Sequence, residues 1–398
     1  MMGAVLILVA AAGGDAPPAG GWLDAVTARR VARNPPLGPV PADPTNRWAD
    51  HEPAARLGHR LFFDARLSAS GTVSCASCHD PAFGFADRRA IAVGEGRGTR
   101  HSMSVLHAAH QRWLTWDGRA DTLWGQATQP FETAHEHGTT RRQVLGVIAG
   151  DPELRAAWRA AFGSDPPAAD ADDASIDAGF AMVGKAIAAY ERRLVGGPSA
   201  YDRWWTRRAA GDPHADVELS EPARRGLLLF FGKADCFQCH HGALFSDGEF
   251  HAIGIPAPGG MPTDPGRYAV VDRVRADPMN AAGPHSDARE GSQARISSTL
   301  VNSPERWGEF RTPSLRNAAA TPPYMHDGQF ATLAQVVRFY STLEGAVSLD
   351  HHRETVLRKL GLSEAEQSDL VAFLESLGGS PPAAPWGQPP APAAAPVR

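Results

Sequence analysis

The sequence lacks the features that mark several common classes of protein. Its longest apolar run covers only residues 4–12, whereas about 20 residues are needed to cross a bilayer. It has no excess of basic residues, because 39 Lys and Arg stand against 44 Asp and Glu, for a formal net charge of −5. Its 40 glycines and 33 prolines among 398 residues are too few for a low-complexity chain. These properties argue against an integral membrane protein, a nucleic-acid-binding protein and a disordered chain, and the length suggests two or three domains.

The N-terminus is typical of a secretory signal peptide. The apolar run AVLILVAAA at residues 4–12 is followed by the small residues Gly13, Gly14 and Ala16. No Lys or Arg precedes this run, so the amino terminus alone supplies the positive charge, and a frayed apolar terminus is the alternative. The sequence predicts that residues 1–20 are a signal peptide and that the mature protein is exported to the periplasm.

Cysteine is scarce, and the positions of the four cysteines are the most informative feature of the sequence. They form two pairs, each followed directly by a histidine, in the motifs CASCH and CFQCH: Cys75, Cys78 and His79, and Cys236, Cys239 and His240. This is the spacing of c-type haem attachment, in which both thiols bond to one porphyrin and the histidine ligates the iron. A thioredoxin-like redox pair or half of a zinc site does not require that histidine, and no further cysteine is present to complete a zinc set. The sequence therefore predicts two covalently bound c-type haems.

The remaining pattern is mostly helical. Apolar residues at three- and four-residue steps over 176–194 predict a long amphipathic helix, which the Gly-Gly pair at 196–197 ends. Ser220 is placed to cap a helix that leads into the second haem motif, and Ser363 with Glu366 forms a capping-box pattern before the last helix. No run of alternating strands competes with these signals. The predicted fold class is therefore mostly α.

The two haem motifs lie 161 residues apart, which leaves room for one cytochrome c-like domain around each. We expect an N-terminal linker over 21–44, a first domain over 45–214 and a second domain over 215–378. Within the second domain, residues 255–310 are rich in Gly, Pro, Asp and Ser, which predicts a long irregular insertion. The Pro- and Ala-rich segment 379–398 predicts a disordered tail.

Five collinear blocks around the two motifs resemble the bacterial dihaem cytochrome c peroxidases and their MauG-type relatives. They are LGHRLFFDARLS (57–68), CASCHDPAFGFAD (75–87), TWDGRADTLWGQATQP (115–130), LLFFGKADCFQCHHG (228–242) and FRTPSLRNAAATPPYMHDGQFATLAQVVRFY (310–340). The resemblance covers most of the chain and is far more specific than either haem motif alone. It implies a peroxidatic haem in the first domain and an electron-transfer haem in the second, packed across a domain interface.

The resemblance also implies catalytic residues near the first haem. Glu136 matches the family's glutamate that moves protons during peroxide cleavage, and Gln126 and Pro130 precede it at the family's spacing. Trp116, in the TWDGR stretch, matches the aromatic bridge between the two haems. Without the resemblance, Glu136 would be interpreted as a surface acid in a His-rich loop, and Trp116 as an ordinary core residue.

Around the second haem, the resemblance implies further contacts. Arg311 and Arg316 are candidates to pair with haem propionates, and solvent-exposed arginines are the alternative. His251 and His326 match family positions near this haem, but the sequence fixes no role for either of them.

The sequence departs from the family pattern at three positions. Glu95, in AVGEG, replaces a histidine that blocks the peroxidatic iron in typical members, so we expect that iron to be five-coordinate or water-bound. The alternative is that His101, His107 or His110 replaces the missing ligand. His101 replaces an asparagine that helps to bind calcium; imidazole is a poor calcium ligand, so calcium is disfavoured, although backbone carbonyls around Thr312 could still hold it. Tyr340 replaces the methionine that ligates the second iron. We therefore expect Tyr340 to ligate the second iron, with Met325 as the alternative ligand.

Two enzymatic functions follow from the resemblance. The first is a periplasmic peroxidase that reduces hydrogen peroxide to water with electrons from a small cytochrome c or a cupredoxin. The second is a MauG-type oxidase that uses peroxide to oxidise tyrosine or tryptophan residues of a partner protein. The family's usual activity favours the first function, whereas Tyr340 and Glu95 favour the second. A non-enzymic dihaem electron carrier is a third candidate, and it would need strong sixth ligands on both irons.

We expect two covalently attached haems per chain when the protein is exported to an oxidising, haem-loading compartment. Thioether bonds hold a haem through acid-acetone extraction, which removes haem that is not covalently attached. A haemochrome assay on the extracted protein should therefore measure two haems per chain. A result of one haem or none would contradict the assignment of the two motifs.

Overall fold

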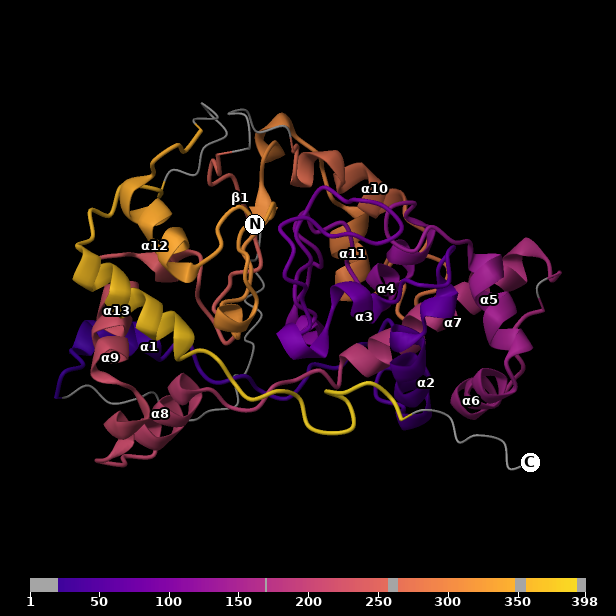
Figure 1. The fold of residues 1–398 in the computed structure, drawn as a ribbon, viewed down its shortest axis with the longest axis horizontal. Coiled ribbons are helices and arrows are strands. Elements are labelled where there is room, and N and C mark those ends of the chain that lie inside the picture. The colour runs from indigo at the N-terminus through magenta and orange to yellow at the C-terminus, as the bar shows by residue number, and fades with distance from the viewer. Residues whose placement is uncertain (1–20, 169, 257–263, 348–355, 392–398) are drawn as a thin grey trace, which may run out of the picture.

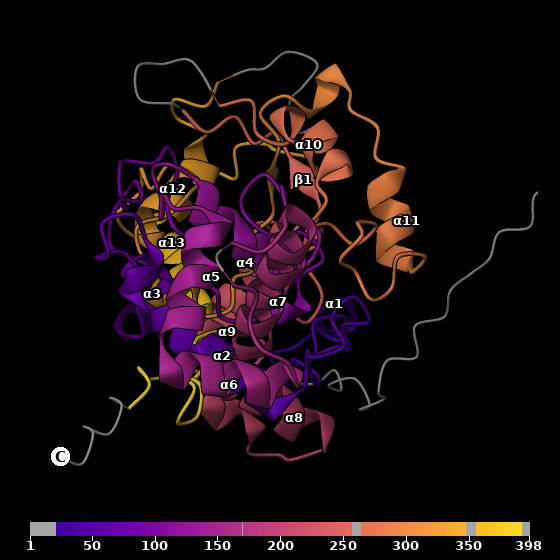
Figure 2. The same cartoon turned by 90° about the vertical axis from the view of Figure 1, so that its right-hand side faces the viewer.

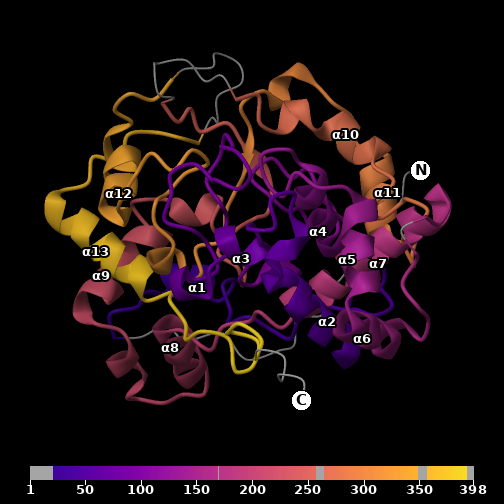
Figure 3. The same ribbon diagram turned by 45° about the vertical axis from the view of Figure 1, so that its right-hand side comes forward.

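The computed structural model describes residues 21–168, 170–256, 264–347 and 356–391. These ranges are mostly helical and contain one antiparallel pair of short strands, β1 (Phe250–His251) and β2 (Phe310–Arg311). The helices gather around two separate hydrophobic cores, which lie side by side in Figures 1 and 3. None of the helices within these ranges is both long enough and apolar enough to cross a membrane. The predicted signal peptide lies outside the described residues.

The first core is built by helices from the N-terminal half of the chain. They are α2 (Glu52–Phe63), α4 (Leu123–Glu132), α5 (Arg141–Gly150), α6 (Pro152–Phe162) and α7 (Asp173–Glu191), with the single turn α3 (Cys75–Cys78) beside them. The central element is α7, because α2, α4 and α5 all pack along it. It corresponds to the predicted long helix, and the side chain of its N-cap residue Asp172 accepts a hydrogen bond from the amide of Ser175.

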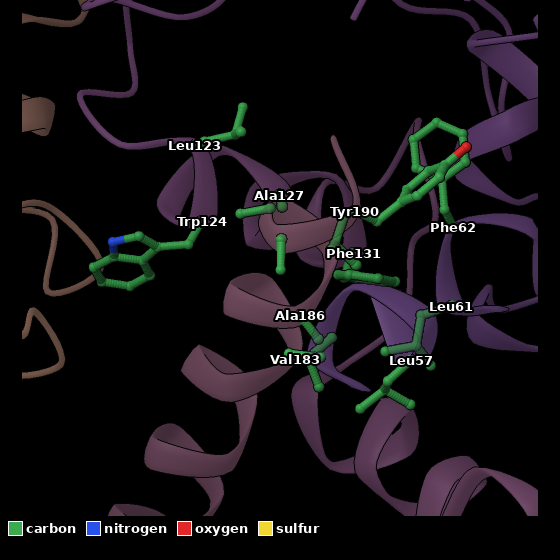
Figure 4. Close-up of a cluster of buried hydrophobic side chains, with 14 of the residues drawn as sticks. Leu57, Leu61, Phe62, Leu123, Trp124, Ala127, Phe131, Val183, Ala186 and Tyr190 are labelled. Atoms are coloured by element: carbon green, nitrogen blue, oxygen red, sulfur yellow. The ribbon is translucent and has the colours of Figure 1, made fainter. Parts of the chain in front are cut away.

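Glycines allow these helices to approach one another closely. A Cβ atom added at Gly58 on α2 would lie 1.9 Å from the carbonyl oxygen of Ala186 on α7. A Cβ atom at Gly184 on α7 would lie 2.4 Å from the carbonyl oxygen of Trp124 on α4. Larger apolar side chains fill the space between the helices, as Figure 4 shows for Leu57, Leu61, Phe62, Phe131 and Val183. The helices beside the first haem motif therefore form a closely packed support.

The second core is built mainly by helices from the C-terminal half of the chain. They are α8 (Ala200–Ala209), α9 (Glu221–Phe231), α12 (Leu333–Thr342) and α13 (Glu364–Glu375), joined by α1 (Ala25–Val31). The helices α9 and α13 pack together so closely that a Cβ atom at Gly226 would lie 1.9 Å from the carbonyl oxygen of Asp369. The predicted caps are confirmed, because the hydroxyl of Ser220 caps α9, and Ser363 and Glu366 form a capping box at the start of α13.

The stretch predicted as an irregular insertion is partly helical. It lies over the first core, as Figure 2 shows, and contains two short helices, α10 (Val271–Ala276) and α11 (Ser292–Ser298). Met279 is buried in the first core, and the carboxylate of Asp121 accepts hydrogen bonds from the amide of Ala281 and the hydroxyl of Ser297. Helices of six and seven residues leave little periodic signal in a sequence, so composition alone could not reveal them.

The predicted N-terminal linker, residues 21–44, is partly helical and packed. It contains α1, whose Ala28 and Val31 are buried in the second core together with Leu23. Part of the segment expected to be a linker is therefore packed, because Leu23, Ala28 and Val31 are buried in the second core.

The predicted disordered tail is packed over much of its length. Residues 379–391 follow a path from the end of α13 toward α2, as Figure 1 shows. The ring of Trp386 contacts the rings of His59 and Tyr190, and its carbonyl oxygen accepts a hydrogen bond of 3.0 Å from the Tyr190 hydroxyl. One large aromatic side chain thus gives an anchor to a segment whose Pro- and Ala-rich composition predicts disorder. The remaining residues of the tail, 392–398, lie outside the described residues.

The carboxylate of Asp121 ties the insertion to the first core, so its removal should destabilise the protein. Asp121→Ala would leave the amide of Ala281 and the hydroxyl of Ser297 without their buried acceptor, which should lower the free energy of unfolding by about 1–3 kcal/mol. Urea titration measures this change. Asp173→Ala is the control, because Asp173 is an exposed residue paired with Arg142 and should contribute about 1 kcal/mol or less. Equal losses in the two variants would contradict the prediction.

Candidate haem sites

The first haem motif lies on a single helical turn beside the first core. This turn, α3, begins after Ser74, which forms a capping box with Ser77, and it ends at His79. Because residues three apart share a helix face, the two thiols of the motif lie on the same side. The Nδ1 of His79 donates a hydrogen bond of 3.2 Å to the carbonyl oxygen of Phe85, which leaves Nε2 as the nitrogen that can bind a metal.

The second haem motif repeats this arrangement. The Nδ1 of His240 donates a hydrogen bond of 2.9 Å to the carbonyl oxygen of Phe245. Phe85 and Phe245 are both buried, and both have a left-handed backbone, with φ of 57° and 51°. A non-glycine residue keeps this conformation only where its surroundings hold it there, so each core fixes the carbonyl in place. Since a carbonyl can only accept, each imidazole carries its proton on Nδ1 and presents an unprotonated Nε2.

The four motif cysteines are free thiols. Burial raises the pKa of Cys75, Cys78 and Cys236, in the last case to about 12, so these thiols stay protonated at neutral pH. Burial also lowers the pKa of His79 and His240, which keeps both imidazoles neutral and able to ligate iron. Paired thiols beside a neutral imidazole are the groups that c-type haem attachment uses, so both motifs fit a haem.

A cavity of about 310 Å³ adjoins the second motif and is lined by its cysteines and histidine. Tyr340, on α12, and Met325, in the loop before this helix, both line the same cavity. Burial raises the pKa of Tyr340, and the nearby Cys239 and Cys236 raise it further. Both candidate ligands of the second iron therefore lie at the second motif.

Arg311 and Arg316 line this cavity too, and both are buried rather than solvent-exposed. Arg316 makes two contacts of 3.0 and 2.8 Å with the carboxylate of Asp202, which neutralises its charge. Arg311 donates instead to the carbonyl oxygens of Thr115 and Thr312, and has no carboxylate partner in the described part of the chain. Burial lowers the pKa of Arg311 to about 10, so it remains cationic at neutral pH. A buried cation without a counter-charge fits a haem propionate.

Trp116 lies where the two halves of the chain meet. Its indole Nε1 donates a hydrogen bond of 2.9 Å to the carbonyl oxygen of His101, and its own carbonyl accepts one of 2.7 Å from the amide of Arg311. Trp116 lines the second-site cavity, while Arg119, three residues later, approaches Glu136 of the first site. This position suits a bridge between the two sites.

The helix α4 and the loop that follows it carry the residues expected to act at the first haem. Gln126 and Pro130 lie on α4, and Glu136 lies in the loop. The carboxylate of Glu136 is partly exposed and lies 3.8 Å from both Nη2 of Arg119 and Nε2 of His135. Burial raises the pKa of both thiols of the first motif, and the charge of Glu136 adds to this rise. The charge of Glu136 therefore acts on the first motif, and its catalytic role stays a prediction.

Sequence reasoning treated the residues around Glu136 only as a His-rich loop, but the structure shows that His137 in this loop is buried. Its side chain is 4% exposed, and its ring packs on that of Phe131 with the centroids 4.9 Å apart. Its Nδ1 has no hydrogen-bond partner among the described residues. Burial, with a smaller contribution from His79, lowers the pKa of His137 to about 4. No sequence signal separates this histidine from the exposed His135 two residues earlier.

The segment that carries Glu95 packs against the same loop. The amide of Glu95 donates a hydrogen bond of 2.8 Å to the carbonyl oxygen of Glu136. The carboxylate of Glu95 accepts hydrogen bonds of 2.9 and 2.6 Å from the amide and hydroxyl of Ser70. The Nδ1 of His101 likewise forms a hydrogen bond of 2.8 Å with the carbonyl oxygen of Arg89.

The carbonyl oxygens that could hold a calcium ion have hydrogen-bond partners within the protein. The carbonyl oxygen of His101 already accepts a hydrogen bond from Trp116. The carbonyl oxygen of Thr312 accepts hydrogen bonds from the hydroxyl of Ser246 at 2.7 Å and from Nη1 of Arg311 at 3.3 Å. These oxygens are therefore used by the protein, and the guanidinium group would repel a divalent cation.

The two family-matched histidines of the second site have protein partners. The Nε2 of His251 lies 2.8 Å from the carboxylate of Asp247, and His326 stacks on Phe310 with the ring centroids 3.9 Å apart. Ligand atoms of Cys239, Asp247 and His251 also lie within 4.8 Å of one another. A thioether at Cys239 would remove its thiolate, so this group is better explained as part of the haem site.

Comparison with known proteins identifies the family. The family model for di-haem cytochrome c peroxidase matches residues 52–210. The chain is 35% identical over 361 residues to the cytochrome-c peroxidase IdrP1 of Denitromonas iodatirespirans, and the match covers 88% of each chain. The chain belongs to the dihaem cytochrome c peroxidase family.

Further matches place MauG proteins among the relatives of this dihaem peroxidase. It is 36% identical over 330 residues to the methylamine utilization protein MauG of Methylorubrum extorquens, covering 82% of this chain and 78% of that protein. A solved MauG-like protein associated with microbial copper homeostasis has a TM-score of 0.68 and 28% identity, covering 89% of this chain and 97% of that one. The protein is a peroxidase-like oxidoreductase with haem cofactors.

We expect Tyr340→Phe to change the second haem. Removing the hydroxyl removes the oxygen that faces the second motif, so the absorption spectrum of this haem should change. Its reduction potential should rise, because an anionic oxygen ligand favours ferric iron. Redox titration followed by absorption measures both properties. Met325→Leu is the matched control and should leave them unchanged; the opposite pattern would assign the ligand to Met325.

Proposed function

We propose that the protein is a periplasmic peroxidase that reduces hydrogen peroxide to water with electrons from a small redox protein, either a cytochrome c or a cupredoxin. Peroxide would react at the haem of His79, and electrons would enter through the haem of His240. The observation that carries the proposal is the duplicated site, in which a buried carbonyl orients the histidine of each CXXCH motif. We infer two cytochrome c-like domains, each with one covalent haem, that meet at Trp116 and Arg311.

The residues around the first motif would direct protons during peroxide cleavage. The haem supplies an iron that peroxide can oxidise. Glu136 takes a proton from the peroxide oxygen nearer the iron and delivers it to the oxygen that leaves as water. Gln126 and Pro130, both on α4, would line this site. The carbonyl oxygen of Pro130 accepts a hydrogen bond from the amide of Thr133, which fixes the start of the Glu136 loop. The complete reaction uses two electrons and two protons for each peroxide and yields two water molecules.

The residues between the sites would position the second haem and carry electrons. Arg311 pairs with a haem propionate, because it is a buried cation without a carboxylate partner in the described residues. Arg316 stays paired with Asp202 and supports the wall of the cavity. Trp116 passes electrons from the second haem to the first, since it is hydrogen-bonded to both halves of the chain.

A MauG-type oxidase is the second candidate function, and Tyr340 favours it. An oxygen ligand on the second iron would stabilise ferric and higher oxidation states, so that both haems could share the oxidising equivalents of peroxide. The enzyme would then remove electrons from tyrosine or tryptophan residues of a partner protein. A non-enzymic dihaem carrier has less support, because Glu95 and His101 are engaged with Ser70 and Arg89 rather than placed to cap the first iron.

The haem-loaded protein should react with peroxide in its fully ferric state. Glu95 is held by Ser70 and does not replace the blocking histidine of typical members, so no prior reduction should be required. Stopped-flow absorption after addition of peroxide measures the reaction. Glu136→Gln should slow it by about 10²-fold or more, while Glu153→Gln, at a surface ion pair with Arg60, should leave it unchanged.

The same preparation separates the candidate functions. A peroxidase should oxidise two molecules of a reduced small cytochrome c or cupredoxin for each peroxide. Oxidation of a co-encoded partner protein without turnover of these donors would assign the MauG-type function instead. A protein with two haems that fails to react with peroxide would contradict both enzymatic functions and support the electron carrier.

A further inference from the structure

One fully buried arginine has no part in the mechanism above. Arg267 lies in the insertion, and only 1% of it is exposed. Its Nη1 donates hydrogen bonds of 3.1 and 2.5 Å to the carbonyl oxygens of Asp117 and Gly118. These two residues directly follow Trp116, and their carbonyls accept no other hydrogen bond among the described residues. The insertion therefore contacts the loop that carries the proposed bridge between the haems.

Two aromatic rings complete the surroundings of this guanidinium group. Its central carbon lies 4.4 Å from the ring centre of Trp113 and 4.3 Å from that of Phe250. No carboxylate pairs with Arg267 in the described part of the chain, so carbonyl dipoles and ring faces compensate the cost of burying its charge. Unlike Arg311, Arg267 does not line the cavity at the second motif, so it is not placed to pair with a propionate there.

The main chain around Arg267 is fixed to the second half of the protein. Its amide donates a hydrogen bond of 2.8 Å to the carbonyl oxygen of Glu309. A Cβ atom at the preceding Gly266 would lie 2.2 Å from that same oxygen, so the two segments are in direct contact. The strand β2, which pairs with β1 at Phe250, begins at the residue after Glu309. The guanidinium group thus extends toward the Trp116 loop from a segment that is itself held in place.

A second contact joins the insertion to the same loop. The carboxylate of Asp264, three residues before Arg267, accepts two hydrogen bonds of 2.7 Å from the guanidinium group of Arg100. Arg100 also pairs with the carboxylate of Asp117. The insertion therefore holds this loop both through its main-chain carbonyls and through an ion-pair network.

The turn around Trp116 packs tightly against Arg267. Thr115 and Gly118 both have left-handed backbone conformations, with φ of 71° and 66°. A Cβ atom at Gly118 would lie 2.3 Å from the ring of Phe250 and 2.8 Å from Nη1 of Arg267. Trp116 lies between the two left-handed residues, so a shift of this turn also moves its indole.

We propose that Arg267 is a positioning residue that holds Trp116 in place for electron transfer between the two haems. This inference rests on the proposed function, in which Trp116 carries electrons from the second haem to the first. Each transfer moves one electron and breaks no bond, and Arg267 itself neither carries the electron nor touches a substrate. Because electron transfer slows steeply as the gap between donor and acceptor widens, a displaced indole lowers the rate. The insertion thereby takes part in electron transfer without lying on its path.

Redistribution of an electron between the haems tests this role without peroxide. A photochemical pulse adds one electron to the diferric holoprotein, and absorption at the bands of the two haems follows its redistribution. Arg267→Met fills the space but lacks the hydrogen bonds, so it should slow redistribution by about tenfold or more through misplacement of the indole. Arg267→Lys keeps the charge but lacks the planar group that reaches both carbonyls, and its rate should be intermediate.

Arg275→Met is the matched control. Arg275 lies in the same insertion and also donates to a main-chain carbonyl, that of Leu300 at 2.9 Å. This residue does not contact the Trp116 loop in the described structure, so its replacement should change the rate by about twofold or less. Equal slowing in Arg275→Met and Arg267→Met would overturn the inference.

Two further measurements distinguish positioning from a general loss of structure. Hydrogen–deuterium exchange in Arg267→Met should become faster at the amides of residues 114–120 and stay the same in the helices of both cores. The reduction potentials of both haems should not change in Arg267→Lys, which keeps the buried charge. A slower rate in this variant then cannot come from a changed driving force, whereas shifted potentials that account for the slowing would overturn the inference.

The outcomes separate this inference from the proposed function. Unchanged redistribution in both Arg267 variants would overturn the role of Arg267 and leave the peroxidase function intact. If the unmodified holoprotein redistributes the electron but does not react with peroxide, the proposed function fails, and slower redistribution in the variants would still support the positioning role. Misfolding of both Arg267 variants, or loss of a haem from both, would make Arg267 a residue of the fold and overturn the inference.

Discussion

Both haem sites depend on one hydrogen bond, which runs from the Nδ1 of the motif histidine to the carbonyl oxygen of a buried phenylalanine. This bond fixes the tautomer and the orientation of the ring, and it makes Nε2 a better electron donor to a metal. The acceptor is held because Phe85 and Phe245 are locked in left-handed backbone conformations inside the two cores. The packing of apolar side chains therefore sets the direction in which each imidazole faces.

The buried arginines between the two halves differ in whether a carboxylate neutralises their charge. Arg100 pairs with Asp117 and with Asp264, which joins residues of both halves, and Arg316 is neutralised by Asp202. Arg311 stands apart, because it is buried beside the second motif with only carbonyl and sulfur partners among the described residues. Burying such a cation is costly unless an anion compensates it, which explains why this place suits a propionate and does not suit calcium.

The sequence was most informative where the chemistry is local. The CXXCH spacing, the long helix α7 and the caps of α9 and α13 depend on residues within a few positions of each other, and the structure has all of them. The roles of Glu136, Trp116 and Tyr340 came from the family resemblance, since no local pattern distinguishes them from surface or core residues. They stay predictions that the geometry supports.

Other features depend on contacts between distant residues, which local patterns cannot reveal. The anchoring of Trp386 depends on Tyr190, and the order of the insertion depends on the acceptor at Asp121. The burial of His137 depends on how the Glu136 loop folds onto Phe131 and Ala69. In each case a polar or Pro-rich stretch becomes ordered because another part of the chain offers a specific partner, and composition carries no record of that partner.

The path of the chain has a consequence for the modularity of the protein. The described chain enters the second core at Leu23, builds the first core and then returns to the second. Met279 is buried in the first core, and Trp386 packs on it. The second core therefore needs an N-terminal segment, and the first core needs residues from the C-terminal half. A single cut between the haem motifs would separate each core from some of the side chains that fill it. The two haem-binding halves therefore form one cooperative unit rather than two exchangeable modules.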